Sequence, residues 1–155
     1  MTGKLAILDD VLLFCFRQKF NFGTTTIFKN KFMPSVCFYF QVHQPFRIKH
    51  YSVFDIGKDH FYEDGEKNKW IMDKVSEKCY LPANKKMLEL IKRHKGKFRI
   101  SYSLSGTVIE QMELFRPDVL QSFVDLSKTG CVEFLSETYF HSLSFLYNKE
   151  EFERQ

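Results

Sequence analysis

Two groups of polar residues in the sequence have side chains that suit a ligand-binding site. Imidazole, amide and carboxylate groups form hydrogen bonds with polar ligands, and a histidine can also gain or lose a proton near neutral pH. The first group is His43 and Gln44, and the second is Glu133, Glu137 and His141. Because the two groups lie far apart in the chain, they form one site only if the fold brings them together.

Three segments of the chain alternate between large apolar residues and small or polar ones, which is the pattern of a β-strand with two unlike faces. The segments are residues 35–42, 98–105 and 131–137. His43 comes directly after the first segment, and Glu133 and Glu137 share the polar face of the third. The alternation therefore predicts that these side chains lie on the polar face of a sheet.

Helical stretches separate the predicted strands. They are residues 65–78, 82–94, 107–115 and 117–128. Pro82 and Pro117 stand where a helix can begin without losing a hydrogen bond, and Gly96 and Gly130 supply stops after the helices. Strands that alternate with helices predict βαβ units, and hence a parallel sheet in an α/β fold.

The polar face of the predicted strands indicates a barrel. A parallel sheet with helices on both faces would have apolar residues on both faces of its strands. We therefore expect helices on the apolar face and a ligand pocket on the polar face, inside a barrel whose functional residues follow the carboxyl ends of the strands. His43 and the segment 137–141 fall at those ends. Since three strands cannot close a barrel, we expect the N-terminal part, about three βα units, of an incomplete barrel.

The composition of the chain limits the classes of function. A hydrophobic fraction of 44%, with 18 Phe, excludes an intrinsically disordered chain. The net charge is only +4, and charges of both signs alternate over residues 67–97, so no nucleic-acid partner is expected. The apolar run at residues 11–16 is too short to span a membrane and has no cleavage site after it. We predict a cytoplasmic protein with no membrane partner.

The cysteines do not indicate a metal or a disulfide framework. Cys15, Cys37, Cys79 and Cys131 are widely spaced and include no C-x-x-C pair. Because three of the four lie among apolar neighbours, we expect buried free thiols in a reducing compartment. No metal site and no other cofactor are predicted.

The patterning of the chain changes near Met33. Residues 1–32 have no clean period, and residues 21–31 show no apolar face. We interpret residues 1–32 as a poorly patterned N-terminal extension and residues 33–155 as the domain proper.

Several of these segments resemble the motifs of glycoside hydrolase family 57. The tripeptide His43-Gln44-Pro45 resembles the opening motif of that family, and residues 130–143 resemble its second motif. Between them, residues 80–84 and 103–106, followed by Glu110-Gln111, are similar to the α-amylase-like members. The resemblance runs from about Met33 to the end of the chain. It implies an incomplete (β/α)₇ relative of the TIM barrel that acts on an α-glucan or a maltooligosaccharide.

The resemblance also implies a retaining mechanism, in which a Glu nucleophile and an Asp acid/base act on the sugar. In the family both residues follow the second motif, beyond Gln155, so we assign no catalytic residue in this chain. A C-terminal half that is encoded separately is one partner to consider. The family resemblance implies five substrate-binding residues in this chain, which are His43, Gln44, Glu133, Glu137 and His141.

Other interpretations stay open at this point. The chain can be a non-catalytic truncated fragment that binds glucan weakly at most. A carbohydrate deacetylase would need an Asp pair near the first strand and two histidines at helical spacing. The pair Asp9-Asp10 precedes the domain, and no two histidines are four residues apart. Among single residues, His43 can be a strand-end histidine bonded to backbone, and Glu133 can form an ion pair with Arg99.

Overall fold

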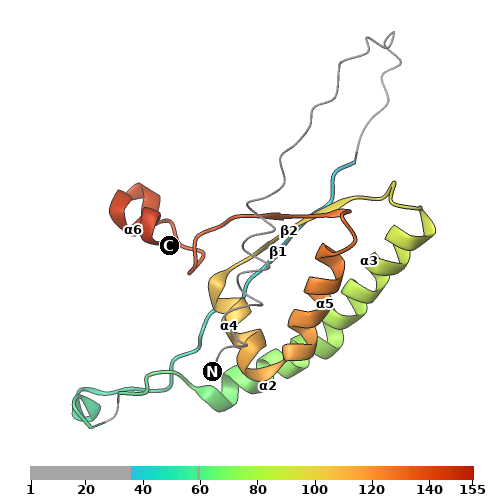
Figure 1. Ribbon diagram of the computed structural model, residues 1–155. Coiled ribbons are helices and arrows are strands. Elements are labelled where there is room, and N and C mark those ends of the chain that lie inside the picture. The colour runs from blue at the N-terminus through green and yellow to red at the C-terminus, as the bar shows by residue number, and fades with distance from the viewer. Residues whose placement is uncertain (1–35, 59) are drawn as a thin grey trace, which may run out of the picture.

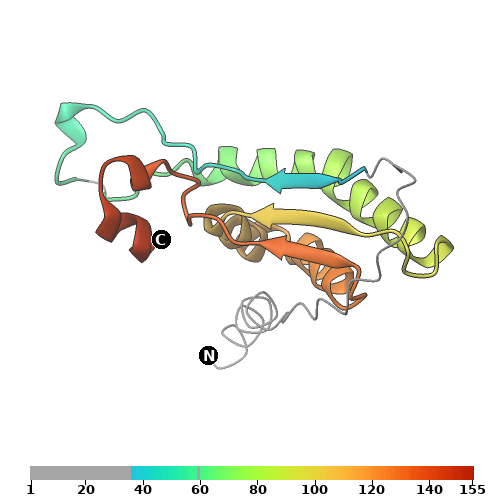
Figure 2. The ribbon, with the colours of Figure 1, turned by 90° about the horizontal axis from the view of Figure 1, so that it is seen from above.

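The computed structural model describes residues 36–58 and 60–155, which form an α/β fold with a parallel sheet. The sheet has three strands in the order β1-β2-β3. Figure 2 shows the three arrows side by side and pointing the same way. The strands are β1 (Tyr39–Val42), β2 (Ile100–Leu104) and β3 (Val132–Leu135). The predicted extension, residues 1–32, and Cys15 lie outside the described residues.

Helices fill the connections between the strands and, as Figure 1 shows, α2 to α5 all lie on one face of the sheet. The helices are α2 (Gly65–Val75), a π-helical turn (Ser76–Tyr80), α3 (Leu81–Arg93), α4 (Gly106–Phe115), α5 (Pro117–Ser127) and α6 (Lys149–Arg154). Short 3₁₀ turns occur at Val53–Asp55 and Ser144–Leu146. The connections that leave the carboxyl ends of the strands carry the candidate site.

The register of the sheet confirms the predicted parallel pairing and the two unlike faces. Gln41 lies opposite Ser103, and Ser101 lies opposite Glu133. Because side chains alternate along a strand, these polar residues share one face across all three strands. Each strand is shorter than predicted, because regular pairing covers only part of each alternating segment.

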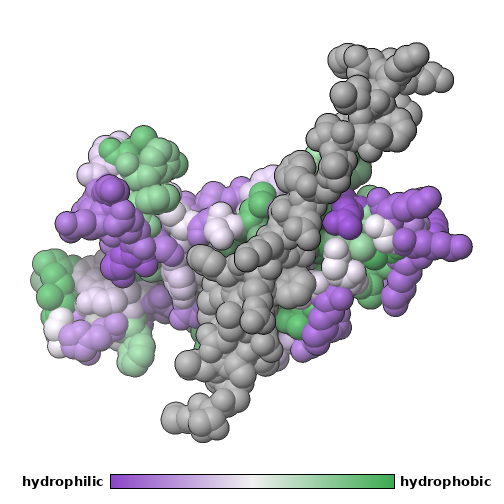
Figure 3. All heavy atoms as spheres, turned by 45° about the horizontal axis from the view of Figure 1, so that its top comes forward, coloured by the Kyte–Doolittle hydropathy of each residue, from purple (hydrophilic) through white to green (hydrophobic). Residues whose placement is uncertain are grey.

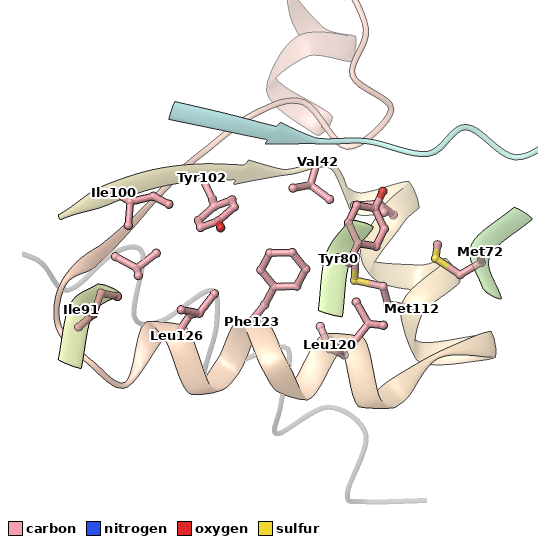
Figure 4. Close-up of a cluster of buried hydrophobic side chains, with 13 residues drawn as sticks. Val42, Met72, Tyr80, Ile91, Ile100, Tyr102, Met112, Leu120, Phe123 and Leu126 are labelled. Atoms are coloured by element: carbon pink, nitrogen blue, oxygen red, sulfur yellow. The ribbon is translucent and has the colours of Figure 1, made fainter. Parts of the chain in front are cut away.

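The apolar face of the sheet packs on the helices and forms the core, which Figure 4 shows in close-up. The ring of Tyr102 on β2 meets the ring of Phe123 on α5 edge-on, with centroids 5.5 Å apart. Ile91, Val108 and Leu126 are buried around them. Fully burying such an aliphatic side chain contributes about 1.5–3 kcal/mol relative to exposure. The helices α3, α4 and α5 therefore hold the sheet through this cluster.

One continuous helical run, from Gly65 to Arg93, replaces the two helices predicted at residues 65–78 and 82–94. Proline lacks an N–H, and its ring clashes with the carbonyl four residues earlier in a regular α-helix. The π-helical turn relieves this conflict, because Leu81 donates its N–H to the carbonyl of Ser76, five residues earlier. The prediction that a separate helix begins at Pro82 is wrong for this reason.

The prediction of buried thiols is also wrong for two cysteines. Cys37 and Cys79 are exposed free thiols, and Cys131 is half-buried. Cys37 precedes the outer strand β1, and Cys79 faces solvent from the helical run. The sulfur of Cys131 lies 3.7 Å from the carbonyl oxygen of Gly96.

Large apolar side chains also remain on the surface. The exposed rings include Phe38, which precedes β1, and Phe40 on β1. Phe54, Phe61 and Tyr147 are exposed as well. Figure 3 shows patches of apolar side chains among hydrophilic ones on the visible face. In the described part of the chain, no helix combines the length and the apolarity needed to cross a bilayer.

Candidate functional site

The carboxyl ends of the strands bring four of the polar side chains together. The amide nitrogen of Gln41, on β1, lies 3.1 Å from Oε2 of Glu137 and 2.8 Å from Nδ1 of His141. Nδ1 of His141 is itself 3.0 Å from Oε2 of Glu137. The rings of His43 and His141 have their centroids 4.8 Å apart. We call these residues, Gln41, His43, Glu137 and His141, the rim cluster.

A small residue on the middle strand, Ser103, allows the side chains of Gln41 and Glu137 to reach each other. Gln41 and Glu137 belong to segments on either side of β2, so their side chains meet only above the residue that β2 presents there. Ser103 occupies that position, paired with Gln41 in register and fully buried. Its hydroxyl lies 2.7 Å from that of Tyr39, which fixes it in place. A small residue on the central strand therefore leaves room for contact between the outer two.

A tight turn after β3 places Glu137 and His141 side by side. His141 adopts a left-handed backbone conformation with φ of 54°, and its N–H donates to the carbonyl of Thr138 at 2.9 Å. The hydroxyl of Thr138 accepts a hydrogen bond from the N–H of Ser142 at 2.8 Å. For a residue other than glycine, this conformation costs about 1–3 kcal/mol. The turn thus holds His141 in a strained position that faces Glu137.

Glu137 is more enclosed than its partner His141. Its side chain is 12% exposed, while that of His141 is 45% exposed. Oε2 takes the hydrogen bonds from Gln41 and His141, whereas Oε1 is buried and has no hydrogen-bond partner among the described residues. A buried acceptor without a donor is unfavourable. A ligand hydroxyl that donates to Oε1 would remove this cost.

The environment of His43 keeps its imidazole neutral. Burial lowers the pKa of His43 below 6.5, and the charges of His141 and Arg47 lower it further, against an opposing effect of Glu137. Nδ1 of His43 lies 2.7 Å from the hydroxyl of Ser105, so the ring is also fixed in orientation. His43 therefore acts as a neutral hydrogen-bonding group at physiological pH.

Gln44 turns away from the rim cluster and helps to shape the loop that follows β1. Its Oε1 accepts from Nη2 of Arg47 at 2.7 Å, and its amide donates to the hydroxyl of Tyr80 at 3.3 Å. Gln111 on α4 donates to the backbone carbonyl of Gln44 at 2.8 Å. Asn68 on α2 accepts from the backbone N–H of Arg47 at 2.8 Å. The loop is therefore anchored to α2, to α4 and to the π-helical turn.

Glu133 also lies apart from the rim cluster, nearer the amino end of β3. Its one described hydrogen bond, at 3.5 Å, comes from the hydroxyl of Ser101 on β2. Among residues 36–58 and 60–155, no ion pair joins Glu133 to Arg99, which corrects the proposed structural pairing of these two residues. Of the five predicted residues, the structure brings His43, Glu137 and His141 together.

The segment after β3 is pinned to the start of α4. The ring of Tyr139 lies directly over Gly106, where an added Cβ would overlap the ring carbons. The hydroxyl of Tyr139 donates to Glu110 at 2.9 Å, and its carbonyl accepts from the N–H of Thr107 at 3.2 Å. Burial, and next the hydrogen bond to Glu110, raise the pKa of Tyr139 to about 12. These contacts fix the turn that carries His141.

Three residues that shape the site, Gln41, Ser105 and Gln111, are not among the predicted substrate-binding residues, although Ser105 stands at the carboxyl end of the second predicted strand. Gln41 was visible as a polar residue on the polar face of the first strand, and Gln111 belonged to a motif-like segment. Neither pattern indicates which partner a side chain selects. In the described part of the chain, no group of three or more His, Cys, Asp or Glu residues is placed to hold a metal ion.

The parallel sheet with helices in its connections places this chain among the α/β proteins, and comparisons with known proteins identify the family within that class as one of glycoside hydrolases. The chain belongs to glycosyl hydrolase family 57, because the model of this family matches residues 37–155. This match confirms the resemblance seen in the motifs.

One relative and the search of solved structures complete the comparison. The chain is 41% identical over 118 residues to a protein from Methanocaldococcus jannaschii named "Putative alpha-amylase". The alignment covers 75% of this chain and 25% of the relative, so the chain spans about a quarter of that protein's length. No solved structure matches the chain.

Proposed function

We propose that this chain contributes a sugar-binding edge to a retaining, α-amylase-like glycoside hydrolase with an incomplete barrel. The rim cluster supports this proposal, since an amide, a carboxylate and two imidazoles offer both donors and acceptors to sugar hydroxyls. Family membership supports the class of reaction, and the name of the archaeal relative supports an α-glucan as the substrate.

The observation that carries the proposal is the geometry of Glu137. Two neighbours fix Oε2, and Oε1 is left buried without a partner in the described part of the chain. A sugar hydroxyl is a neutral donor of the right kind for such an oxygen. We propose that sugar hydroxyls contact Glu137, His43 and His141, while Gln44 acts by shaping the loop.

Two of the predicted substrate-binding residues, Gln44 and Glu133, lie away from the rim cluster, and we assign them no direct contact with the sugar bound there. Glu133 meets Ser101 near the amino end of β3, so it contacts sugar only if the glucan extends along the polar face of the sheet.

The nucleophile and the acid are proposed to come from further barrel strands, in the same protein or in a partner chain. In a retaining enzyme those carboxyls stand about 5–5.5 Å apart.

The proposal is tested by titrating the 155-residue chain with maltoheptaose and recording binding by NMR. Glu137→Gln keeps the shape of the side chain and removes one carboxylate acceptor, so binding should weaken about three- to tenfold. The matched control is Glu89→Gln, at an exposed carboxylate on α3. Equal binding by both variants, or no binding by the native chain, would contradict the sugar-binding edge. Turnover of starch by the pure chain would contradict the absence of catalytic residues.

A non-catalytic chain is the second candidate function, and the exposed apolar surface favours it. Within residues 36–58 and 60–155, β1 and β3 pair with a strand on one side only, and such open edges together with exposed rings such as Phe38 and Phe40 promote association between copies. On this second candidate function, the isolated chain should elute as aggregates in size-exclusion chromatography, whereas the sugar-binding edge requires a soluble chain that binds maltoheptaose. A soluble monomer that binds maltoheptaose would argue for a self-sufficient binding module.

A further inference from the structure

Ser105 occupies a helix-capping position without using its side chain as a cap. It precedes α4 as the N-cap residue, where a serine hydroxyl ordinarily accepts a hydrogen bond from a backbone N–H of the first turn. Here the side chain makes no capping bond. Its oxygen lies instead 2.7 Å from Nδ1 of His43 and 3.1 Å from the hydroxyl of Thr107. The buried hydroxyl of Ser105 therefore serves His43 and not its own helix.

The hydrogens available to these three side chains determine how they pair. Thr107 lies 3.5 Å from Nδ1 of His43, and neither its hydroxyl nor that of Ser105 has another hydrogen-bond partner among the described residues. With the proton on Nδ1, the set holds three donor hydrogens, and the protonated nitrogen cannot accept. One buried hydroxyl then has no acceptor. With Nδ1 unprotonated, Thr107 donates to Ser105, Ser105 donates to Nδ1, and every hydrogen is used.

We infer that Ser105 and Thr107 are positioning residues that hold His43 in the tautomer with its proton on Nε2. His43 then presents an N–H donor to the ligand. Resting on the proposed function, the inference assigns the partner of Nε2 as a sugar oxygen that accepts a hydrogen bond. The opposite polarity holds at Oε1 of Glu137, which requires a hydroxyl that donates. The rim cluster thus selects sugar oxygens by the direction of their hydrogen bonds.

Two further observations agree with this assignment. In the described part of the chain, Nε2 of His43 has no hydrogen-bond partner, so it is available to a ligand. Burial and the charges around His43 lower its pKa, so the singly protonated ring is the form present at neutral pH. A neutral imidazole has one donor and one acceptor nitrogen, and Ser105 already uses the acceptor.

The test is ¹⁵N NMR of the 155-residue chain carrying ¹⁵N-labelled histidine, recorded in solution or, for sedimented protein, by solid-state methods, because the ¹⁵N shifts distinguish imidazole tautomers in both states. Near neutral pH we expect the Nε2–H form of His43 to exceed the other about tenfold or more. Ser105→Ala should yield a mixture of both tautomers, and Ser105→Thr, which keeps a hydroxyl, should restore the single form. The control Ser122→Ala removes a hydroxyl on α5 that contacts Asn84 and leaves His43 unaffected.

The outcomes separate this inference from the proposed function. A native signal with the proton on Nδ1 would overturn the inference, whether or not the variants fold. An unchanged Nε2–H signal in Ser105→Ala would overturn the role of Ser105. Maltoheptaose is then added to the native chain. A shift of the Nε2 resonance supports sugar binding, whereas the expected tautomer with no response to the sugar contradicts the proposed function alone.

Discussion

Gln41 on the first strand and Glu137 beyond the third are joined by a hydrogen bond of 3.1 Å, although the second strand lies between them. The amide of Gln41 has two hydrogens, one for the carboxylate and one for the imidazole of His141. This single side chain therefore links the two segments that form the rim cluster. Substitutions of Gln41 and of Ser103 test this contact and the space that it occupies.

Gln41→Ala should weaken ligand binding more than it weakens the fold. Gln41 is exposed, so the loss of its hydrogen bonds is expected to change the free energy of unfolding by about 1 kcal/mol or less. The same loss frees Glu137 and His141 to move, and maltoheptaose binding should fall about threefold or more. Urea unfolding and sugar titration measure the two effects. Gln121→Ala, at an exposed Gln that bonds Asp125, is the control.

Ser103→Leu should break the rim cluster from below. A leucine at this buried position would fill the space in which Gln41 and Glu137 meet, and overpacking of this kind costs about 1–3 kcal/mol. Ser103→Ala removes only the hydrogen bond to Tyr39, worth about 1 kcal/mol, and keeps the space. Chemical denaturation of both variants compares size with hydrogen bonding. Equal destabilisation would contradict the importance of a small residue here.

Gly106→Ala should displace the turn that follows β3. The added Cβ would overlap the ring of Tyr139, so the ring or the helix start must move, at a cost of about 1–3 kcal/mol. Gly65→Ala is the matched control, because a Cβ on Gly65 meets no atom within 4 Å. Thermal unfolding measures both. If the two alanines have equal effects, the close approach of Tyr139 to α4 is not a constraint on the sequence.

The stability of the chain should fall as the solution becomes acidic, in part through His43. The pKa of His43 is lower in the folded state than its ordinary value of 6.5, so between the two values the unfolded chain binds more protons. The stabilisation is therefore complete above about pH 6.5 and is lost as the pH falls through the lowered pKa. Urea unfolding across this range should show a weaker dependence in His43→Gln than in the native chain.

The sequence predicted the sheet and three of the four rim-cluster residues, because alternation and strand ends carry that information directly. The polar face that holds Glu137, and the rim positions of His43 and His141, follow from period-two patterning. The pairing of Glu133 did not follow, because the register places Ser101 opposite it, and register is not visible in one strand. The contacts of Gln41 with Glu137 and His141 depend on the small size of Ser103, a relation between strands that neither segment shows alone.

The π-helical turn beside Pro82 has a consequence for how this family of sequences can vary. One extra residue in a turn rotates everything after it by about 100° relative to what precedes it. Tyr80, whose hydroxyl meets Gln44, stands at the end of this inserted turn. If Pro82 were lost without the deletion of one residue, or one residue were deleted while Pro82 stayed, the faces of α3 would be rotated relative to those of α2. We expect insertions, deletions and proline usage at this point to covary among relatives.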